Sequence, residues 1–370
     1  MVQVIAQKEG KTVHFSGTYD PSDVQILLKP AQIAPTPVGE KEALIQSGKR
    51  HYSEMLSAEK VPDERYMTLF REALTRNKAR LRYDIDLLAR KIHWRTQTHF
   101  KCVLVSLARA GTPIGVLLAR SLKRLGVEVH HYSVSIIRGR GIDENAMRHI
   151  LERHDARHIV FVDGWTGKGA ITRELEISLA RQRLGIEPYL AVVADPAGTA
   201  HLAATSEDYV IPSGLLNGIV SGLISRSVLN EEIVGKDDFH ACLFMEEHRE
   251  ADLSKAFIEA IDGVVVSKSS QSPWSEDIAA ASQRACRALL ESIMANEGVT
   301  DINRIKPGIA EATRAILRRV PDKLILRDLA DPEVQHMIYL AEQSGVPVEQ
   351  RDIGNYRALT IIKKLGGEQE

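Results

Sequence analysis

The sequence predicts an α/β protein with a parallel sheet, followed by a smaller C-terminal α/β domain. The first observation is a regular alternation of apolar, strand-like segments and helical segments between residues 101 and 196. The second is that small or charged residues follow each of these strands directly. Alternation at this spacing forms a parallel sheet with helices on its faces. Because ligands bind outside the carboxyl ends of such strands, we expect the site at that edge of the sheet.

The size and composition are those of a protein with more than one domain. The chain has 370 residues, 44% of them hydrophobic, and a net charge of -1. The length predicts two or three domains, and the charge predicts no general attraction to nucleic acid or anionic membranes. The three cysteines are widely separated, which suits a reducing compartment. The charged N-terminus does not resemble a signal peptide, and no apolar run is long enough to cross a bilayer. We therefore expect a cytoplasmic protein without a membrane partner.

The N-terminal 60 residues are expected to form an irregular extension wrapped on the main domain. They contain four prolines and short strand-like pieces such as VQILLKP. From residue 63 to residue 95 apolar side chains recur at helical spacing, which predicts helices. We place the extension at residues 1–60 and begin the main domain at residue 61.

The central part of the main domain consists of four strands with helices between them. The strands are KCVLVSL (101–107), VEVHHYSVSII (127–137), HIVFVD (158–163) and EPYLAVVADP (187–196). The helices are IGVLLARSLKRLG (114–126), DENAMRHILERH (143–154) and AITRELEISLARQRLG (170–185). Asp143 is of a residue type that favours the N-cap of the second helix.

The remaining chain is expected to cover the strand ends and then form the second domain. Residues 209–229 are rich in glycine and serine and could cap the site, and residues 269–277 (SSQSPWSED) read as a linker. Helix-like and strand-like segments alternate again toward the C-terminus. The main domain is therefore placed at residues 61–270 and the C-terminal domain at residues 285–370, with a boundary near 270–300.

The turn at residues 163–169, Asp-Gly-Trp-Thr-Gly-Lys-Gly, is the strongest candidate for a binding site. Its three glycines allow a tight turn with inward-pointing N–H groups. The helix that begins near Ala170 adds free N–H groups and the positive end of its dipole. The turn therefore suits a phosphate monoester, although it does not match the Walker pattern GxxxxGK[ST]. The alternative is an ordinary strand–helix turn with a solvated Asp163.

Two further loops bring arginines to the same edge of the sheet. Residues 106–113 (SLARAGTP) contribute Arg109, and residues 138–141 (RGRG) contribute Arg138 and Arg140. The forked guanidinium donors bind diphosphate in a bidentate manner. Each arginine alone could be a surface charge, but three on one edge favour a diphosphate site.

The order of these loops resembles that of type I phosphoribosyltransferases, particularly the orotate-type branch. FVDGWTGKGAITREL follows the family motif without a gap, and ARAGTP fits the pyrophosphate loop. The whole chain is similar to the phosphoribosyltransferases encoded beside tellurite-resistance and stress-response genes, which carry a C-terminal Pelota-type RNA-binding domain. Gly164 replaces the second acid of the family's Asp-Asp pair, and Ala170 replaces a threonine that usually touches the phosphate.

The resemblance implies a type I phosphoribosyltransferase fold and a nucleotide-forming reaction. The donor would be 5-phosphoribosyl-1-pyrophosphate (PRPP) with Mg²⁺, and a base nitrogen would displace pyrophosphate at ribose C1 through placement and charge stabilisation. An unknown base would lie near residues 211–217, Asp163 would hold the ribose hydroxyls and, with the substrate, Mg²⁺, and such transferases often form homodimers. The implied catalytic residues are Asp163, Arg109, Arg138 and Arg140. The implied phosphate and pyrophosphate contacts are Ser106, Ala108, Ala110, Gly111, Thr166, Gly167, Lys168, Gly169 and Ala170.

Two alternative functions stay open at this point. The first is a non-catalytic sensor of a phosphoribosyl or nucleotide ligand, which the missing acid at Gly164 favours. The second is a cysteine protease, because similar proteins are sometimes labelled as the StiP family of cysteine proteases. That chemistry needs a thiolate beside a histidine. His240 and Cys242 are two residues apart, which is roughly 7 Å along a strand, and Cys102 and Cys286 lie in apolar segments that suit buried thiols.

The C-terminal domain is expected to bind RNA because of the resemblance alone. Residues 301–370 contain 11 Lys and Arg and 11 Asp and Glu, so the segment has no net charge. A local basic patch could still form from Arg314, Arg318, Arg319, Lys323, Lys363 and Lys364. The alternative is a solvated helix face. His149, His154 and His158 lie across a helix and a turn, and we interpret them as surface histidines rather than metal ligands.

Overall fold

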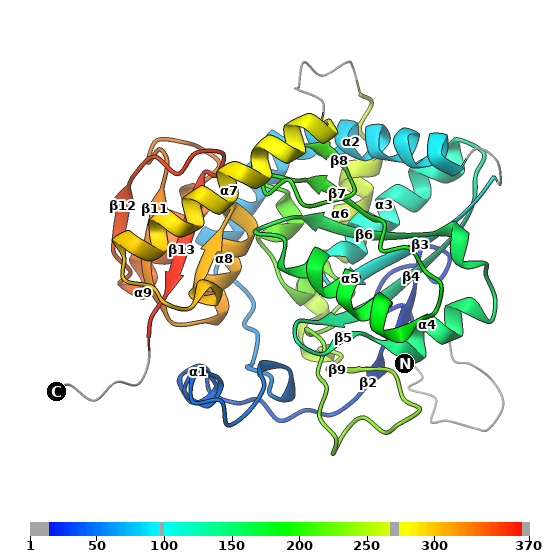
Figure 1. Ribbon diagram of the computed structural model, residues 1–370, viewed down its shortest axis with the longest axis horizontal. Helices are drawn as coiled ribbons and strands as arrows, with labels where there is room; N and C mark the ends of the chain where they lie inside the picture. Colours follow the sequence, from blue (N-terminus) through cyan, green and yellow to red (C-terminus); the bar gives the residue numbers. More distant parts are fainter. Residues whose placement is uncertain (1–14, 97–99, 267–273, 365–370) are drawn as a thin grey trace.

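The computed structural model describes residues 15–96, 100–266 and 274–364, and it confirms the α/β class (Figure 1). The main sheet has seven strands in the order β1-β4-β3-β6-β7-β8, with β5 paired to β4. Every pair along the main path is parallel, and β5 alone is antiparallel. The strands are β1 (Gln25–Leu27), β3 (Lys101–Ala108), β4 (Glu128–Ile137), β5 (Gly141–Ile142), β6 (Ile159–Trp165), β7 (Leu190–Ala194) and β8 (Leu202–Thr205).

Alternate residues of the central strands enter two separate cores, as the pleat requires. Leu104 and Val162 pack against one layer of helices, and Val105 and Phe161 pack on the opposite side. The first layer consists of α2 (Glu64–Thr96), α3 (Gly111–Arg124) and α6 (Ser254–Asp262). The second layer consists of α4 (Glu144–Leu151) and α5 (Ala170–Gln182). With both faces covered, the strand ends are the part of the sheet left for a site.

The N-terminal segment takes part in the main fold more closely than expected. Strand β1 extends the sheet along β4, and β2 (Lys29–Pro30) pairs with β9 (Ala241–Cys242). Helix α1 (Val38–Gln46) follows β2. Short 3-10 turns complete this domain: η1 (Tyr52–Glu54), η2 (Ala156–His158), η3 (Pro212–Gly214), η4 (Gly218–Val220) and η5 (Glu246–Ala251).

Over the described residues, the C-terminal domain is a four-stranded sheet with three helices, which confirms the expected smaller α/β unit. Helix α7 (Glu276–Asn296) leads from the main domain into it (Figure 1). Its sheet has the order β10-β13-β11-β12. The elements are η6 (Ile302–Arg304), β10 (Ile305–Pro307), α8 (Ile309–Arg318), β11 (Pro321–Leu326), α9 (Gln335–Ser344), β12 (Val348–Gln350) and β13 (Ala358–Ile362).

The two domains share a continuous apolar core. Ile309 and Ile316 of α8 belong to the same buried cluster as Tyr66 of α2 and Leu215. Polar contacts add to this docking, since Glu333 accepts hydrogen bonds from the side chain of Asn77 and from the N–H of Val210. In the part of the chain that the structure describes, no helix is long and apolar enough to cross a membrane.

A candidate anion-binding cavity between the two domains

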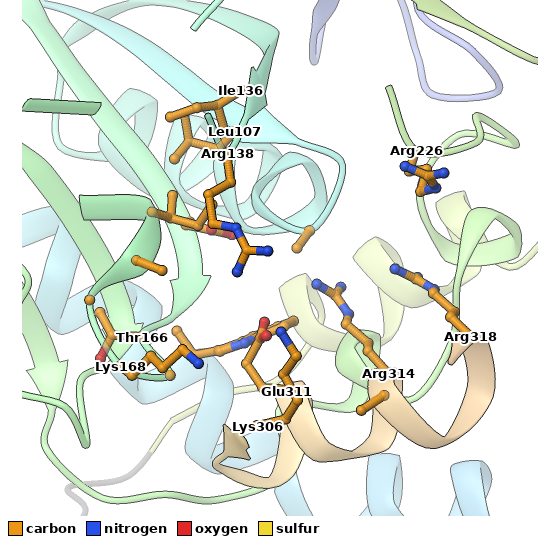
Figure 2. A pocket seen from close by; sticks show the side chains of 18 of the residues that line it. Leu107, Ile136, Arg138, Thr166, Lys168, Arg226, Lys306, Glu311, Arg314 and Arg318 are labelled. Carbon is orange, nitrogen blue, oxygen red and sulfur yellow. The ribbon is translucent and has the colours of Figure 1, made fainter. Parts of the chain in front are cut away.

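A cavity of about 330 Å³ lies between the strand ends of the main sheet and helix α8 (Figure 2). Residues at the ends of β3, β4 and β6 line one side of it, and residues of β10 and α8 line the other. Of the implied site residues, the structure brings the following to this cavity: Ala108, Arg109, Ala110, Arg138, Asp163, Thr166, Gly167, Lys168, Gly169 and Ala170.

Three implied site residues do not line the cavity, and the structure gives a reason for each. The Ser106 hydroxyl is in the core, 2.9 Å from Nε2 of His131. Gly111 allows close packing on β6, because a Cβ there would lie 2.4 Å from the Val162 carbonyl oxygen. The Arg140 guanidinium turns away to an ion pair with Glu54 at 3.0 Å.

The turn after β6 is held in place by hydrogen bonds to the buried carboxylate of Asp195. Thr166 Oγ1 donates to Asp195 at 2.5 Å, and Asp195 also accepts from the N–H of Thr199 at 2.9 Å. The threonine hydroxyl therefore orders the turn. Gly169 directly precedes α5 and has a φ of +76°, a backbone conformation that would be strained in a residue with a side chain. The free N–H groups at this helix start suit an anion.

Lys168 differs from the expectation of a free phosphate-binding charge. Its ammonium donates to the backbone carbonyls of Ile302 and Ile305 in the C-terminal domain, the latter at 2.7 Å. Burial, followed by the nearby Lys306 and Arg138 charges, lowers the pKa of Lys168 to about 7. The residue therefore ties the turn to the second domain, and its positive charge is only partial at neutral pH.

Asp163 lies near the end of β6, and its carboxyl group is half-buried at the cavity. Burial raises its pKa to about 7, against the opposing effect of a hydrogen bond from the N–H of Gly164 at 2.8 Å. Among the described residues no group of three or more His, Cys, Asp or Glu side chains is arranged to hold a metal ion. Mg²⁺ can bind through one carboxylate and ligand phosphates, so the Mg²⁺ expectation stays a prediction.

Arg109 reaches the cavity but is already neutralised by a residue that sequence reasoning missed. Its Nη1 lies 2.9 Å from Glu59 Oε2 and donates to the Ile224 carbonyl at 2.7 Å. Burial raises the pKa of Glu59, but the Arg109 and Arg318 charges outweigh it and bring it to about 2. Arg138 donates to Asn303 Oδ1 at 3.0 Å and so contacts the C-terminal domain.

Six further cations line the cavity and were not among the implied site residues. They are Lys41, Arg226, Lys306, Arg314, Arg318 and Arg319. Figure 2 shows Arg314 and Arg318 directed toward the same space as Arg138 and Lys306. The spacing of Arg314 and Arg318 places them on one face of α8. That spacing is visible in the sequence, but the docking that turns this face inward is not.

Burial acts on most of these cations. It lowers the pKa of Lys41 to about 7, that of Lys306 to about 8 and that of Arg226 to about 10. Arg314 lies 4.4 Å from the ring centre of Trp165. Within the described ranges, Nη1 of Arg226 and the Nε atoms of Arg314 and Arg318 are buried without a hydrogen-bond partner.

The three cysteines are free and buried in this structure. Cys102 and Cys242 are fully buried, which raises the pKa of each thiol to about 12. Cys286 is 6% exposed, and its sulfur lies 3.0 Å from the Tyr356 hydroxyl. Nδ1 of His240 contacts the Ser135 hydroxyl at 2.8 Å.

Two family models match the chain. Residues 17–262 match a family described as tellurite-like stress resistance cysteine protease StiP, and residues 284–364 match a model described as a PELOTA RNA-binding domain. A protein of Acinetobacter baylyi named cysteine protease StiP is 42% identical over 366 residues, which is 95% of each chain. The resemblance to a stress-resistance family with a C-terminal Pelota-type domain is therefore confirmed.

The similar solved structures match about a third of the chain. The hypoxanthine phosphoribosyltransferase of Trypanosoma cruzi is 14% identical, with a TM-score of 0.28, and the match covers 36% of this chain and 82% of that one. A second structure of that enzyme, in complex with the product IMP, is 16% identical with a TM-score of 0.29, and covers 36% and 79%.

These findings contradict the prediction that the chain is a phosphoribosyltransferase. The family and the Acinetobacter relative are both named as a cysteine protease, which is an enzyme of a different class. The predicted substrates, PRPP and an acceptor base, are therefore no longer supported. The homodimer stays a prediction.

Proposed function

The chain belongs to the family described as tellurite-like stress resistance cysteine protease StiP, and we propose that it binds a phosphorylated small molecule with at least two negative charges between its domains. The charge of the cavity carries this proposal. Nine Lys and Arg side chains line about 330 Å³, against two carboxylates, Asp163 and Glu311. A cavity of this volume suits a small ligand.

The unpartnered guanidinium nitrogens favour an anion with several oxygens. A buried donor without an acceptor costs about 1–3 kcal/mol, and three such nitrogens belong to Arg226, Arg314 and Arg318. Phosphate oxygens accept from guanidinium groups in a bidentate manner. On the opposite wall, the turn before α5 offers the N–H groups of a helix start. A ligand with two phosphate groups could accept hydrogen bonds from the guanidinium groups on one side of the cavity and from the N–H groups of the turn on the other.

Isothermal titration with inorganic pyrophosphate tests this proposal. We expect the wild-type chain to bind it and Arg314→Gln to weaken binding roughly 10- to 100-fold, because a hydrogen bond to a charged group contributes about 1.5–3 kcal/mol. Arg287→Gln removes the same charge from the exposed side of α7 and is the matched control. An equal loss in both variants, or no binding by the wild type, would contradict the proposal.

Peptide hydrolysis is the second candidate function, and the names of the family and of the relative favour it. Cys286 is our candidate nucleophile, because Cys102 and Cys242 are fully buried while Cys286 has some exposure. Through Tyr356, whose hydroxyl donates to the Gly167 carbonyl at 2.7 Å, Cys286 is also next to the cavity turn. Hydrolysis at this thiol would require Tyr356 to move and a histidine to approach.

Digestion of a mixed peptide library, followed by mass spectrometry, tests this second candidate. If Cys286 is the nucleophile, Cys286→Ser abolishes cleavage while Cys102→Ser and Cys242→Ser retain it. Cleavage that survives in Cys286→Ser would exclude this cysteine, and the absence of cleavage by the wild-type chain would count against the candidate.

A further inference from the structure

Four cations of the C-terminal domain gather beside helix α8 and line the cavity toward the main domain. We define the α8 face as Lys306, Arg314, Arg318 and Arg319, all of which line the cavity. Lys323, Arg351 and Arg357 of this domain are instead held in ion pairs with carboxylates of the same domain. Lys323 and Arg351 both contact Glu297, at 2.8 and 2.6 Å, and Arg357 contacts Asp331 at 2.5 Å.

The main domain covers the α8 face. Arg314 stacks on Trp165. Arg318 donates to the Asn217 side chain, and Arg319 donates to Glu42 at 2.7 Å. Figure 2 shows Arg314 and Arg318 directed into the cavity. While the domains are docked, a macromolecule outside the protein therefore cannot contact the α8 face as a whole.

Contacts away from the α8 face hold the docked arrangement. The Asp208 carboxylate accepts from the N–H groups of Ile309 and Arg357, at 3.0 and 2.8 Å. On another side, the Asn77 side chain of α2 donates to both carboxylate oxygens of Glu333 at 3.1 Å. These contacts can be weakened without changing a residue of the face itself.

We propose that the α8 face is the RNA-binding surface of the C-terminal domain and that docking masks it, so that RNA binding and the docked arrangement exclude one another. Nucleic acids bind to clusters of Lys and Arg that are free to contact phosphates. Residues 284–364 match an RNA-binding model, and the α8 face is where such a cluster lies. An RNA hairpin cannot enter a cavity of about 330 Å³, so the domains must separate before it binds.

The cavity ligand would strengthen this exclusion, a consequence that rests on the proposed function. An anion held by the α8 face and by Arg138 of the main domain contacts both domains at once. It stabilises the docked arrangement by mass action. Occupancy of the cavity and binding of RNA are therefore expected to oppose each other.

Fluorescence anisotropy of the full chain with a fluorescein-labelled 20-nucleotide RNA hairpin tests the masking. Asn77→Asp places a second carboxylate against Glu333 and weakens docking, so RNA affinity should rise at least fivefold. Asn296→Asp adds the same charge at an exposed position of α7 and should change affinity less than twofold. The double variant N77D/E333Q removes the repulsion and should return affinity to the wild-type level, which also excludes general unfolding as the cause.

The face itself is tested in the same background. Adding R314Q and R318Q to N77D should abolish the gained affinity. If N77D binds RNA no more tightly than the wild type, or if the two arginine changes have no effect, the proposal is overturned. Pyrophosphate at constant ionic strength should weaken RNA binding to the wild type. If pyrophosphate does not weaken RNA binding while N77D still binds RNA more tightly than the wild type, the proposed effect of the cavity ligand is wrong, but the masking of the α8 face by docking is still supported.

Discussion

At the residue scale, three lysines and one carboxyl group decide how the charge of the cavity responds to pH. Asp163, whose pKa burial raises to about 7, gains a negative charge over the same range in which the lysines lose their positive charge. Burial lowers the pKa of Lys41 and Lys168 to about 7 and that of Lys306 to about 8, against an ordinary value of 10.5. These side chains are therefore protonated below pH 6 and largely neutral above pH 9. A bound anion favours the protonated form, so binding takes up protons.

Anion affinity should consequently fall as the pH rises from 6 to 9. Sulfate is the suitable probe, because its own charge does not change in this range. We expect its affinity to fall at least tenfold across the range. The measurement is a calorimetric titration at each pH with matched ionic strength. A sulfate affinity that is constant between pH 6 and pH 9 would contradict the assignment of these lysines to the site.

At the scale of single elements, the turn before α5 depends on Gly169 for two separate reasons. Its φ of +76° strains any other residue, and a Cβ there would lie 2.7 Å from Thr199 Cγ2. Gly126 also has a positive φ, +81°, but a Cβ at that position would meet nothing within 4 Å. Comparison of the two positions separates backbone strain from crowding.

Gly169→Ala should therefore destabilise the protein more than Gly126→Ala. Strain alone is expected to cost about 1 kcal/mol at each position, and the crowding adds to it only at Gly169. Gly169→Ala should also weaken pyrophosphate binding, whereas Gly126→Ala should not. Urea unfolding and calorimetric titration of both variants provide the test. Equal losses of stability would show that Thr199 gives way and that crowding does not matter.

The same scale shows how far the sequence alone could predict this molecule. The strands and helices between residues 101 and 196 follow from local periodicity, and so does the turn after Asp163. The position of Ser106 did not follow, because its hydroxyl faces His131 in the core. The contribution of α8 to the cavity could not be predicted either, because the sequence pattern of a basic helix face is the same whether that face contacts solvent or a second domain. The sequence leaves open whether Arg314 and Arg318 form a local basic patch or a solvated helix face, and only the docking shows that they line the cavity.

At the scale of the whole molecule, the site exists only because two domains meet. The main sheet supplies Asp163 and the helix start of α5, and the C-terminal domain supplies Lys306, Arg314 and Arg318. The shared apolar core and the buried contacts of Asp208 and Glu333 keep the two sets together. The cavity is thus a property of the docked chain and not of either domain.

A crystal structure of the full chain with pyrophosphate tests the central claim most directly. We predict that the diphosphate lies in the cavity, with oxygens within hydrogen-bond distance of Arg314 and of the N–H groups at the start of α5. The unpartnered guanidinium nitrogens give this prediction its physical basis. A pyrophosphate bound elsewhere on the surface, with the cavity empty at a saturating concentration, would contradict the account.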